Sequence, residues 1–231
     1  LQRAYDQILH DVCLQKLHVI FAIDRSGLVG EDGETHQGIF DSAYLSHIPN
    51  MVVIAPKNRY ELTKSMEFAM EYDGPIAIKY SKGDAYYGLR EHLDPMELGK
   101  SEVLAEGTRV ALIAVGNMVE EAVTVYETLQ EEGKMITLVN ARFVKPLDEE
   151  LLIQLAKTHD TVITLEEHVL NGGYGQAVDA FYMQHEVDNI HVHNIAIDDC
   201  FVEHGSVKEL RKLLGLDAKS VTDVVRSYWN R

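Results

Sequence analysis

Runs of continuous apolar residues alternate along the chain with segments in which apolar residues return at helical spacing. The continuous runs have the length of strands buried on both faces, and they comprise residues 18–23, 51–55, 76–80, 110–115, 136–140, 161–165 and 190–195. The spaced segments predict helices, and they comprise residues 1–15, 40–47, 58–72, 119–132, 206–213, one starting at 148, one ending at 185 and one starting at 220. Strands that alternate with helices predict parallel sheets with right-handed crossovers.

The alternation is interrupted at residues 85–101, which lack periodicity and contain Gly88 and Pro95. Such a stretch is typical of a linker. We therefore expect two structural units, residues 1–84 and residues 102–231, which suits a chain of 231 residues because domains commonly have about 100 residues. The predicted fold class is α/β, with two three-layer α/β/α units whose sheets are mainly parallel.

Polar residues at the predicted helix starts indicate where several helices begin. Asn58 with Glu61 predicts a capping box, and Ser206 with Glu209 predicts another. Asp148 is expected to cap the helix that follows it. The inward face of the helix after Asn58 is predicted to be formed by its apolar positions, namely Leu62, Met66, Ala69 and Met70.

A polar, glycine-rich loop follows the first apolar run and has the sequence DRSGLVGEDGETHQG, residues 24–38. It carries Arg25, Asp32 and His36 among four glycines. Glycine lets the backbone fold tightly and approach a ligand closely. A second polar loop, residues 81–84, follows the third apolar run. Both loops come after the carboxyl ends of predicted strands, where open α/β sheets bind ligands, which favours a functional loop over a solvated turn.

The side chains of these loops suit the binding of a phosphorylated, carbonyl-containing substrate. A carboxylate such as Asp32 can orient the His36 imidazole and raise its pKa, and the imidazole can then exchange protons with a substrate oxygen. Arg25 and Lys82, at two strand ends, can hold one phosphate. A surface histidine and a pair of solvated charges remain the alternatives.

Other polar clusters give weaker signals. The glycine-rich residues 171–175 lack the lysine and the spacing of phosphate-binding loops, so a tight turn or a close subunit contact is favoured. His191 and His193 lie on the same side of a strand, but no third ligand is evident nearby, and we expect no metal site. The polar cluster at residues 166–168 is compatible with a site or an interface, and both remain open.

Composition narrows the partners. The chain has 21 Lys and Arg against 37 Asp and Glu, a formal net charge of −16. Such a surface disfavours nucleic acid and anionic membranes, and no apolar run reaches the length of a membrane span. The only two cysteines, Cys13 and Cys200, match no zinc spacing and are typical of a reduced, cytoplasmic protein. Because Leu1 lies within a helical pattern, we expect the chain to be part of a longer polypeptide.

The string LQRAYDQILHDVCLQKLHVIFAIDRSGLVGEDGETHQGIFDSAYL, followed by IPNMVVIAP, NARFVKPLD and TLEEHVLNGGYGQAV, resembles the 1-deoxy-D-xylulose 5-phosphate synthase family of the transketolase superfamily. The resemblance covers the whole chain. It implies that residues 1–84 form a pyrimidine-binding domain that is incomplete at its N-terminus, and that residues 102–231 form the transketolase C-terminal domain.

The resemblance also implies an activity and roles for individual residues. The family condenses pyruvate with D-glyceraldehyde 3-phosphate, releases carbon dioxide, and serves isoprene, thiamine and pyridoxal biosynthesis as a homodimer. By resemblance, Arg25 binds the acceptor phosphate, and Asp32 with His36 contacts substrate oxygens and assists proton transfer. Lys82 lies where a YPRG-like string usually has a second phosphate-binding arginine; the string here is YSKG. Arg3 matches an arginine near the thiamine ring.

The resemblance places part of the machinery outside the chain. The family uses thiamine diphosphate and Mg²⁺, and the motif that holds the diphosphate and the metal belongs to an upstream N-terminal domain. The glutamate that activates the aminopyrimidine also precedes Leu1. The chain alone is therefore expected to be inactive.

Two other functions remain open. The chain is also compatible with the beta subunit of a 2-oxoacid dehydrogenase or another transketolase-like half. A non-catalytic fragment that dimerises is the second alternative.

Overall fold

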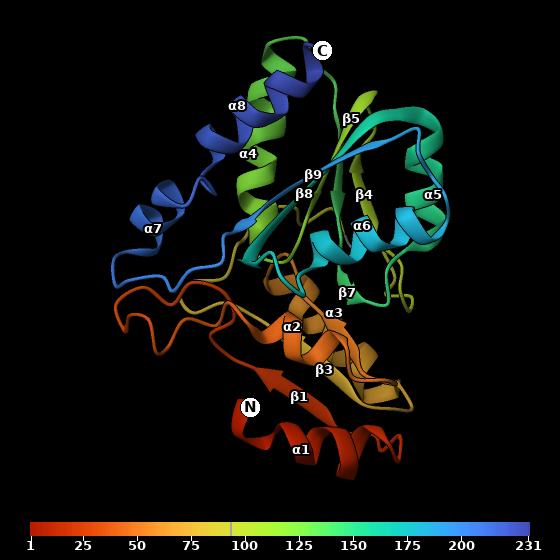
Figure 1. Ribbon diagram of the computed structural model, residues 1–231, viewed down its shortest axis with the longest axis vertical. Coiled ribbons are helices and arrows are strands. Elements are labelled where there is room, and N and C mark those ends of the chain that lie inside the picture. The colour runs from red at the N-terminus through yellow and green to blue at the C-terminus, as the bar shows by residue number, and fades with distance from the viewer. Residues whose placement is uncertain (93) are drawn as a thin grey trace.

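The computed structural model describes residues 1–92 and 94–231 and contains two β-sheets (Figure 1). The first sheet has the order β1-β3-β2-β7, with strands Ile20–Ile23 (β1), Val52–Ile54 (β2), Ile76–Lys79 (β3) and Phe143–Lys145 (β7). Strands β1, β2 and β3 run parallel, and β7 is antiparallel to β2. The carboxyl ends of β1 and β3 therefore lie next to each other.

The second sheet has the order β4-β6-β5-β8-β9. Its strands are Glu102–Ala105 (β4), Arg109–Ala114 (β5), Thr137–Asn140 (β6), His159–Val169 (β8) and His191–Ile197 (β9). Only β4 pairs antiparallel in this sheet, and the other pairs are parallel. The predicted fold class, two mainly parallel α/β units, is confirmed.

Helices cover both faces of both sheets (Figure 1). They are a 3₁₀ turn Gln2–Ala4 (η1), Tyr5–Gln7 (α1), a π-helical segment Ile8–Cys13 (η2), Asp41–Ser46 (α2), Arg59–Glu71 (α3), Met118–Glu131 (α4), Glu149–Thr158 (α5), Tyr174–Gln184 (α6), Val207–Leu213 (α7) and Ala218–Trp229 (α8). Helix α3 packs on one face of the first sheet, and η2 with α2 packs on the other. Helices α4 and α8 cover one face of the second sheet, and α5 with α6 covers the other.

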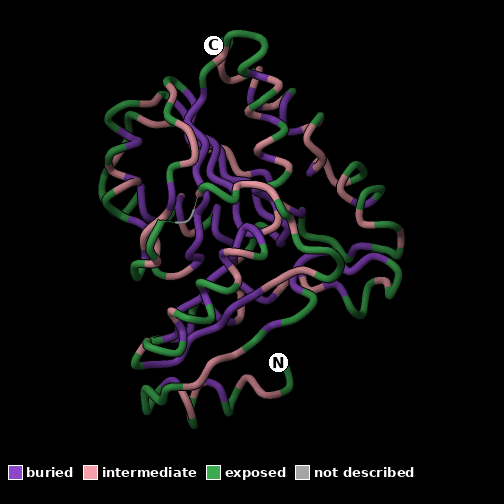
Figure 2. The backbone as a smooth tube through the Cα atoms, turned by 180° about the vertical axis from the view of Figure 1, so that it is seen from behind, coloured by how far each residue is buried: buried purple, intermediate pink, exposed green. Residues whose placement is uncertain are grey.

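The buried residues run along the strands, whereas exposed residues follow the outer helices and loops (Figure 2). One apolar cluster joins the two units, because Leu45 and Val53 of the first unit belong to the same buried cluster as Leu152 and Tyr174 of the second. The units therefore share part of their core, although their exact boundaries stay a prediction.

Strand β7 shows how closely the two units are joined. The sequence pattern did not predict β4 or β7, and it assigned residues 143–145 to the second unit. The structure pairs Phe143 and Lys145 with Ile54 and Val53 of the first sheet. A segment from the second half of the chain thus forms the edge of the first sheet.

The capping predictions meet with different outcomes. Ser206 and Glu209 form the predicted capping box, and the Asp148 side chain accepts the N–H of Leu151. Asn58 caps α3 by accepting the N–H of Glu61 at 2.8 Å. The predicted box at Asn58 is wrong in its other half, because the Glu61 carboxylate accepts the N–H of Lys57 instead.

Other local predictions also need correction. Met66 and Met70 are 38% and 67% exposed, so they do not face inward. Glu61, Ser65 and Ala69 form the buried stripe of α3, because Lys57 and Arg142 compensate the Glu61 charge. The last helix begins at Ala218 rather than at residue 220. Residues 1–15 do not form one regular α-helix, since the helical backbone changes from 3₁₀ to α to π within the segment.

Candidate functional site

A cavity of ≈ 520 Å³ lies where the carboxyl ends of the two sheets face each other. Its walls come from residues after β1, β2, β3 and β5, from the last part of β8, and from α7. They include Arg25, Lys57, Lys79, Lys82, Asn117, Glu166, Glu167, His168 and Arg211. Because side chains from five strand ends converge here, the cavity occupies the place where open α/β sheets bind ligands.

The first residues of the glycine-rich loop at 24–38, residues 24–28, form part of the cavity wall. Gly27 and Gly38 exchange two backbone hydrogen bonds of 2.8 Å each, which close the loop at its neck. A Cβ atom at position 38 would collide with the carbonyl oxygen of Arg25, so the neck requires glycine there. Arg25 itself has a φ of 61°, a backbone conformation that non-glycine residues rarely adopt and that often marks functional positions.

Arg25 and Lys82 lie as the sequence predicted, after neighbouring parallel strands and on the wall of one cavity. The Ser26 N–H donates to the Tyr80 carbonyl at 3.0 Å, which ties the two loops together. Lys82 Nζ lies 3.7 Å from Asp32 Oδ2, and both side chains are partly exposed. The structure thus brings two cations and one carboxylate to the same side of the sheet.

The contacts of Asp32 and His36 differ from the pairing that their spacing suggested. Asp32 pairs with Lys82, whereas His36 Nδ1 lies 2.9 Å from the Thr35 hydroxyl oxygen. Within residues 1–92 and 94–231 no hydrogen bond or ion pair joins Asp32 to His36. Both belong to the protruding part of the loop rather than to the cavity wall. Arg3 is exposed on η1 and is likewise not part of the wall.

The sequence did not single out Lys79, which lies on the cavity wall at the end of β3. Its Nζ donates to the Ser42 hydroxyl at 2.6 Å. Burial lowers the pKa of Lys79, although the charges of Asp41, Glu166 and Glu167 partly offset this effect. A lysine that ends an otherwise apolar run, IAIK, was the available signal.

The polar cluster at residues 166–168 is buried at the end of β8. Glu166 accepts the backbone N–H groups of Tyr174 and Gly175 at 2.9 and 2.8 Å, and so caps α6. Burial raises the pKa of Glu166 to about 7, against the effect of these hydrogen bonds and of Lys79. The glycine-rich turn before α6 is therefore a tight turn around a carboxylate, as its spacing favoured.

His168 is the neutral member of this cluster. Burial, with a contribution from the Lys79 charge, lowers its pKa to about 3. Its Nδ1 donates to the Val169 carbonyl at 2.6 Å, and its Nε2 accepts the Ala43 N–H at 3.3 Å. These two bonds fix one tautomer, and they use both ring nitrogens for structure.

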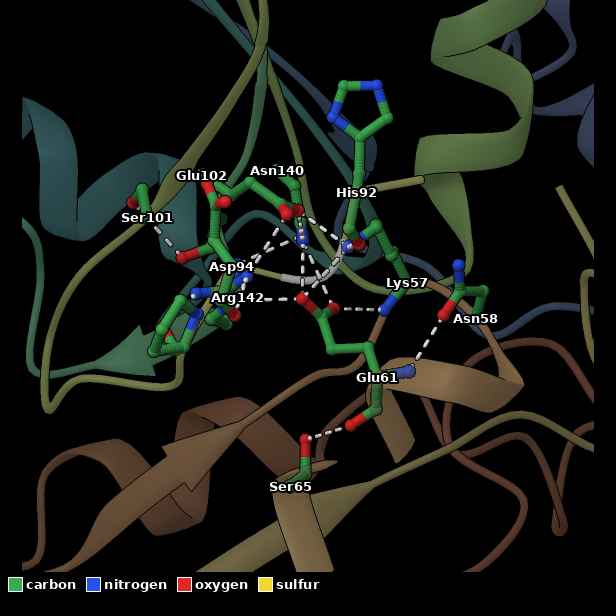
Figure 3. Close-up of polar contacts among 12 residues, drawn as sticks. Lys57, Asn58, Glu61, Ser65, His92, Asp94, Ser101, Glu102, Asn140 and Arg142 are labelled. Carbon is green, nitrogen blue, oxygen red and sulfur yellow. Dashed lines mark hydrogen bonds and ion pairs between the residues drawn. The ribbon is translucent and has the colours of Figure 1, made fainter. Parts of the chain in front are cut away.

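A buried group of four charges lies beside the cavity (Figure 3). Lys57 Nζ is 2.6 Å from Glu102 and 3.2 Å from Glu61, and Arg142 Nε is 2.8 Å from Glu61. Asn140 donates to both carboxylates. Burial raises the pKa of Glu61, but Lys57 and Arg142 outweigh it and hold that pKa below its ordinary value. The four-charge group is neutral overall and joins the two units.

Two features that the sequence disfavoured, a metal site and a membrane-spanning helix, can be compared with the described residues. No group of three or more His, Cys, Asp or Glu among residues 1–92 and 94–231 could hold a metal ion. His191 and His193 both lie within hydrogen-bond distance of the Tyr228 hydroxyl. No helix in the same residues is long and apolar enough to cross a bilayer.

The chain belongs to the transketolase family, because both of its units match transketolase domains. The pyrimidine-binding domain of transketolase matches residues 1–86, and the transketolase C-terminal domain matches residues 99–221. A solved structure described as "Split gene transketolase, inactive beta4 tetramer" superposes with a TM-score of 0.86 at 29% identity, over 99% of this chain and 72% of the other. The transketolase of Campylobacter jejuni shares the fold, with a TM-score of 0.73 at 21% identity over 90% of this chain and 31% of the other.

Among curated proteins the chain is similar to 1-deoxy-D-xylulose-5-phosphate synthases. It is 53% identical to the synthase of Lachnoclostridium phytofermentans over 97% of the chain and 36% of the relative. It is 49% identical to that of Clostridium tetani, over 96% of the chain and 35% of the relative, and 48% identical to that of Syntrophus aciditrophicus, over 100% and 36%. The chain thus spans about 36% of the length of these relatives, and its likeness to this family is confirmed.

Proposed function

We propose that the chain is part of a thiamine-diphosphate-dependent synthase that condenses pyruvate with D-glyceraldehyde 3-phosphate to 1-deoxy-D-xylulose 5-phosphate and carbon dioxide, which places it in isoprenoid precursor synthesis. The observation that carries the proposal is the pair of cations after neighbouring strands, Arg25 and Lys82, on the wall of one cavity. The identity of about half of the residues with synthases of this reaction supports it.

Arg25 and Lys82 bind the phosphate of the triose. A guanidinium can grip a phosphate with two parallel hydrogen bonds, whereas an ammonium acts as a point charge. Lys82 gives up its loose 3.7 Å contact with Asp32 when the phosphate arrives, because a doubly charged ligand attracts it more strongly than one partly exposed carboxylate.

His36 and Asp32 serve the carbonyl end of the substrates. The His36 imidazole is exposed and bonds to the Thr35 hydroxyl, so its Nε2 is directed away from that bond and can hold a proton for a substrate oxygen. Asp32 belongs to the same loop and, by resemblance, contacts substrate oxygens together with His36. These roles rest on the resemblance and on the position of both residues in the same loop.

We expect the cofactor site of the complete enzyme to be shared between this chain and another domain. Thiamine diphosphate, when bound, supplies the carbanion chemistry that the side chains lack. By resemblance to the synthase family, we place the metal and the diphosphate in an upstream N-terminal domain of the same polypeptide. Arg3 faces solvent from η1, which suits a residue that meets the cofactor only when that domain is present.

The reaction is tested with the complete polypeptide, pyruvate and glyceraldehyde 3-phosphate, with a lipoyl domain offered as the competing acceptor. We expect 1-deoxy-D-xylulose 5-phosphate and carbon dioxide in equal amounts. Acetyl transfer to the lipoyl domain without the sugar phosphate would instead assign the chain to a 2-oxoacid dehydrogenase.

We also infer that the isolated chain self-associates without catalysing. The related split-gene structure is described as an inactive β4 tetramer, and the whole enzyme is proposed to be a homodimer. Equilibrium dialysis of thiamine diphosphate against the 231-residue chain tests whether the cofactor site is incomplete, and tight binding would contradict it.

The two unpaired cysteines, Cys13 and Cys200, support a cytoplasmic location.

A further inference from the structure

The glycine-rich loop is held from outside by the second unit. In Figure 1 it lies beside the segment that leads into α7. Gly205 N–H donates to the Gly30 carbonyl at 3.3 Å. A Cβ at Gly30 would lie 2.8 Å from the Gly205 carbonyl oxygen, and Gly30 has a φ of 87°. The two backbones are therefore in close contact, and glycine at position 30 permits it.

Gln37 joins the loop to that segment through both ends of its amide. The side chain is buried, with 5% of its surface exposed. Its Oε1 accepts the N–H of Val29 at 2.7 Å and lies 3.4 Å from the N of Gly30. Its Nε2 donates to the carbonyl of Glu203 at 3.2 Å and lies 3.5 Å from that of Val202. One buried amide thus satisfies backbone groups of both units.

Glu167 makes a second link, from the end of β8. Its Oε2 accepts the backbone N–H of Leu28 at 3.0 Å and the side-chain amide of Asn117 at 2.8 Å. Its Oε1 accepts from Arg211 Nε at 2.6 Å, and Arg211 also pairs with Glu121 of α4. The Glu167 side chain is 2% exposed and is paired with this arginine, so it presents a fixed acceptor to the loop.

These contacts are concentrated on one stretch. The consecutive N–H groups of Leu28, Val29 and Gly30 all point to acceptors on Glu167 or Gln37. Arg25 precedes this stretch by three residues, and Asp32 follows it by two. A loop fixed only at its neck would leave its protruding residues free to move. Here Leu28 bonds directly to Glu167 of the second unit, and Gln37 connects Val29 to the Glu203 carbonyl, so the middle of the loop is held against that unit.

We infer that Gln37 and Glu167 are positioning residues through which the second unit sets the geometry of the substrate loop. The inference rests on the proposed function, because it assigns the loop to the binding of triose phosphate. The second unit thereby acts on the site without touching the substrate, by keeping Arg25 and His36 in one arrangement. Loss of the link lets the loop sample other arrangements and lowers the fraction of binding-competent chains.

Two variants and a matched control test the inference. Gln37→Leu removes the amide but keeps the approximate size of the side chain. Gln176→Leu is the control, because Gln176 also accepts a glycine N–H, that of Gly172 at 2.6 Å, on an exposed turn away from the cavity. Glu167→Gln keeps an acceptor oxygen but loses the charge that pairs with Arg211, and it remains informative if the Leu variant at position 37 does not fold.

The first readout is backbone hydrogen exchange in the 231-residue chain, which requires no activity. We expect exchange of the Val29 and Gly30 N–H groups to accelerate by about tenfold or more in Gln37→Leu, because each loses a hydrogen bond. Glu167→Gln should accelerate exchange of the Leu28 N–H by a smaller factor, because the amide keeps one acceptor oxygen but loses the charge that pairs with Arg211. Gln176→Leu should leave all three unchanged. Unchanged exchange in both test variants would overturn the inference.

The second readout is steady-state kinetics of the complete enzyme. We expect Gln37→Leu to raise KM for the triose phosphate by about tenfold while KM for pyruvate stays near the wild-type value. Faster exchange with unaltered kinetics would show that the link is only structural and would overturn the positioning role. If the wild-type enzyme does not make the sugar phosphate, the proposed function fails. The link between the loop and the second unit is contradicted separately, by hydrogen exchange that does not accelerate in the variants.

Discussion

Two groups of charges lie next to each other in this molecule and have opposite fates. In the four-charge group, Lys57, Glu61, Glu102 and Arg142 have side chains exposed by 3% or less. At the cavity wall, the Lys82 side chain is 38% exposed and lies 3.7 Å from Asp32 of the protruding loop, which is 43% exposed. The same residue types thus form a buried, neutral group between the two units in one place and a solvent-exposed, loosely paired lysine in the other.

The comparison shows that the degree of pairing, and not the charge alone, distinguishes charges that hold the two units together from charges that are available to a ligand. A buried charge is tolerated only when partners compensate it, and each member of the four-charge group is ion-paired to another member. Among the described residues, Glu102 Oε1 accepts no hydrogen bond and faces only the Arg142 charge. An exposed charge with a loose partner is stabilised by water and can exchange that water for a ligand. Lys57 belongs to both places, because it lines the cavity although its ammonium group donates hydrogen bonds to Glu61, Glu102 and the His92 carbonyl.

The largest expected effect comes from breaking the sealed group. Arg142→Met leaves Glu61 and Glu102 with Lys57 as their remaining cation, and should lower the free energy of unfolding by about 3–5 kcal/mol. Urea denaturation of the chain measures it. Arg226→Met is the control, because Arg226 pairs with Glu132 and Asp223 on the surface, and no measurable change is expected there. Equal losses in the two variants would remove the distinction between the groups.

Glu166 sharpens the comparison because it is buried and yet lines the cavity. Burial raises its folded-state pKa from 4.5 to about 7, so the folded chain holds this proton more tightly than the unfolded chain. Its contribution to stability is therefore full below pH 4.5 and is lost as the pH rises towards 7. Glu166→Gln cannot titrate, and the fall in stability between pH 4.5 and 8 should shrink by about 3 kcal/mol relative to the wild type.

The comparison with the wild type is needed because His168 acts in the opposite direction. Its pKa is lowered to about 3, so its contribution is present above pH 6.5 and is lost as the pH falls through the acid range. The difference between the two chains cancels this part. An identical pH dependence of urea unfolding in Glu166→Gln and wild type would show that Glu166 stays ionised in the folded chain.

The sequence predicted those elements of the fold that have a local pattern of apolar residues. The apolar runs at 51–55 and 76–80 became β2 and β3, and the strand-end argument placed Arg25 and Lys82 on one wall. Strand β7 was missed because its three residues form a strand only by pairing with β2, about 90 positions away. Pairing over such a distance leaves no periodic signal in the chain.

The same limit explains the errors at polar residues. The buried stripe of α3 begins with Glu61, and its burial depends on Arg142, which no local pattern connects to it. Gln37 and Lys79 were overlooked because their partners, the Glu203 carbonyl and the Ser42 hydroxyl, lie far along the chain. The spacing of Asp32 and His36 suggested a pair, but the tight turns of the loop direct the carboxylate to Lys82 instead.

The central claim is that the cations after β1 and β3 bind the phosphate of the acceptor, and the kinetics of Arg25→Ala in the complete enzyme test it most directly. We expect KM for glyceraldehyde 3-phosphate to rise by the equivalent of about 1.5–3 kcal/mol, the worth of a charged hydrogen bond, with KM for pyruvate near the wild-type value and Arg226→Ala unaffected. A rise confined to pyruvate would contradict the account.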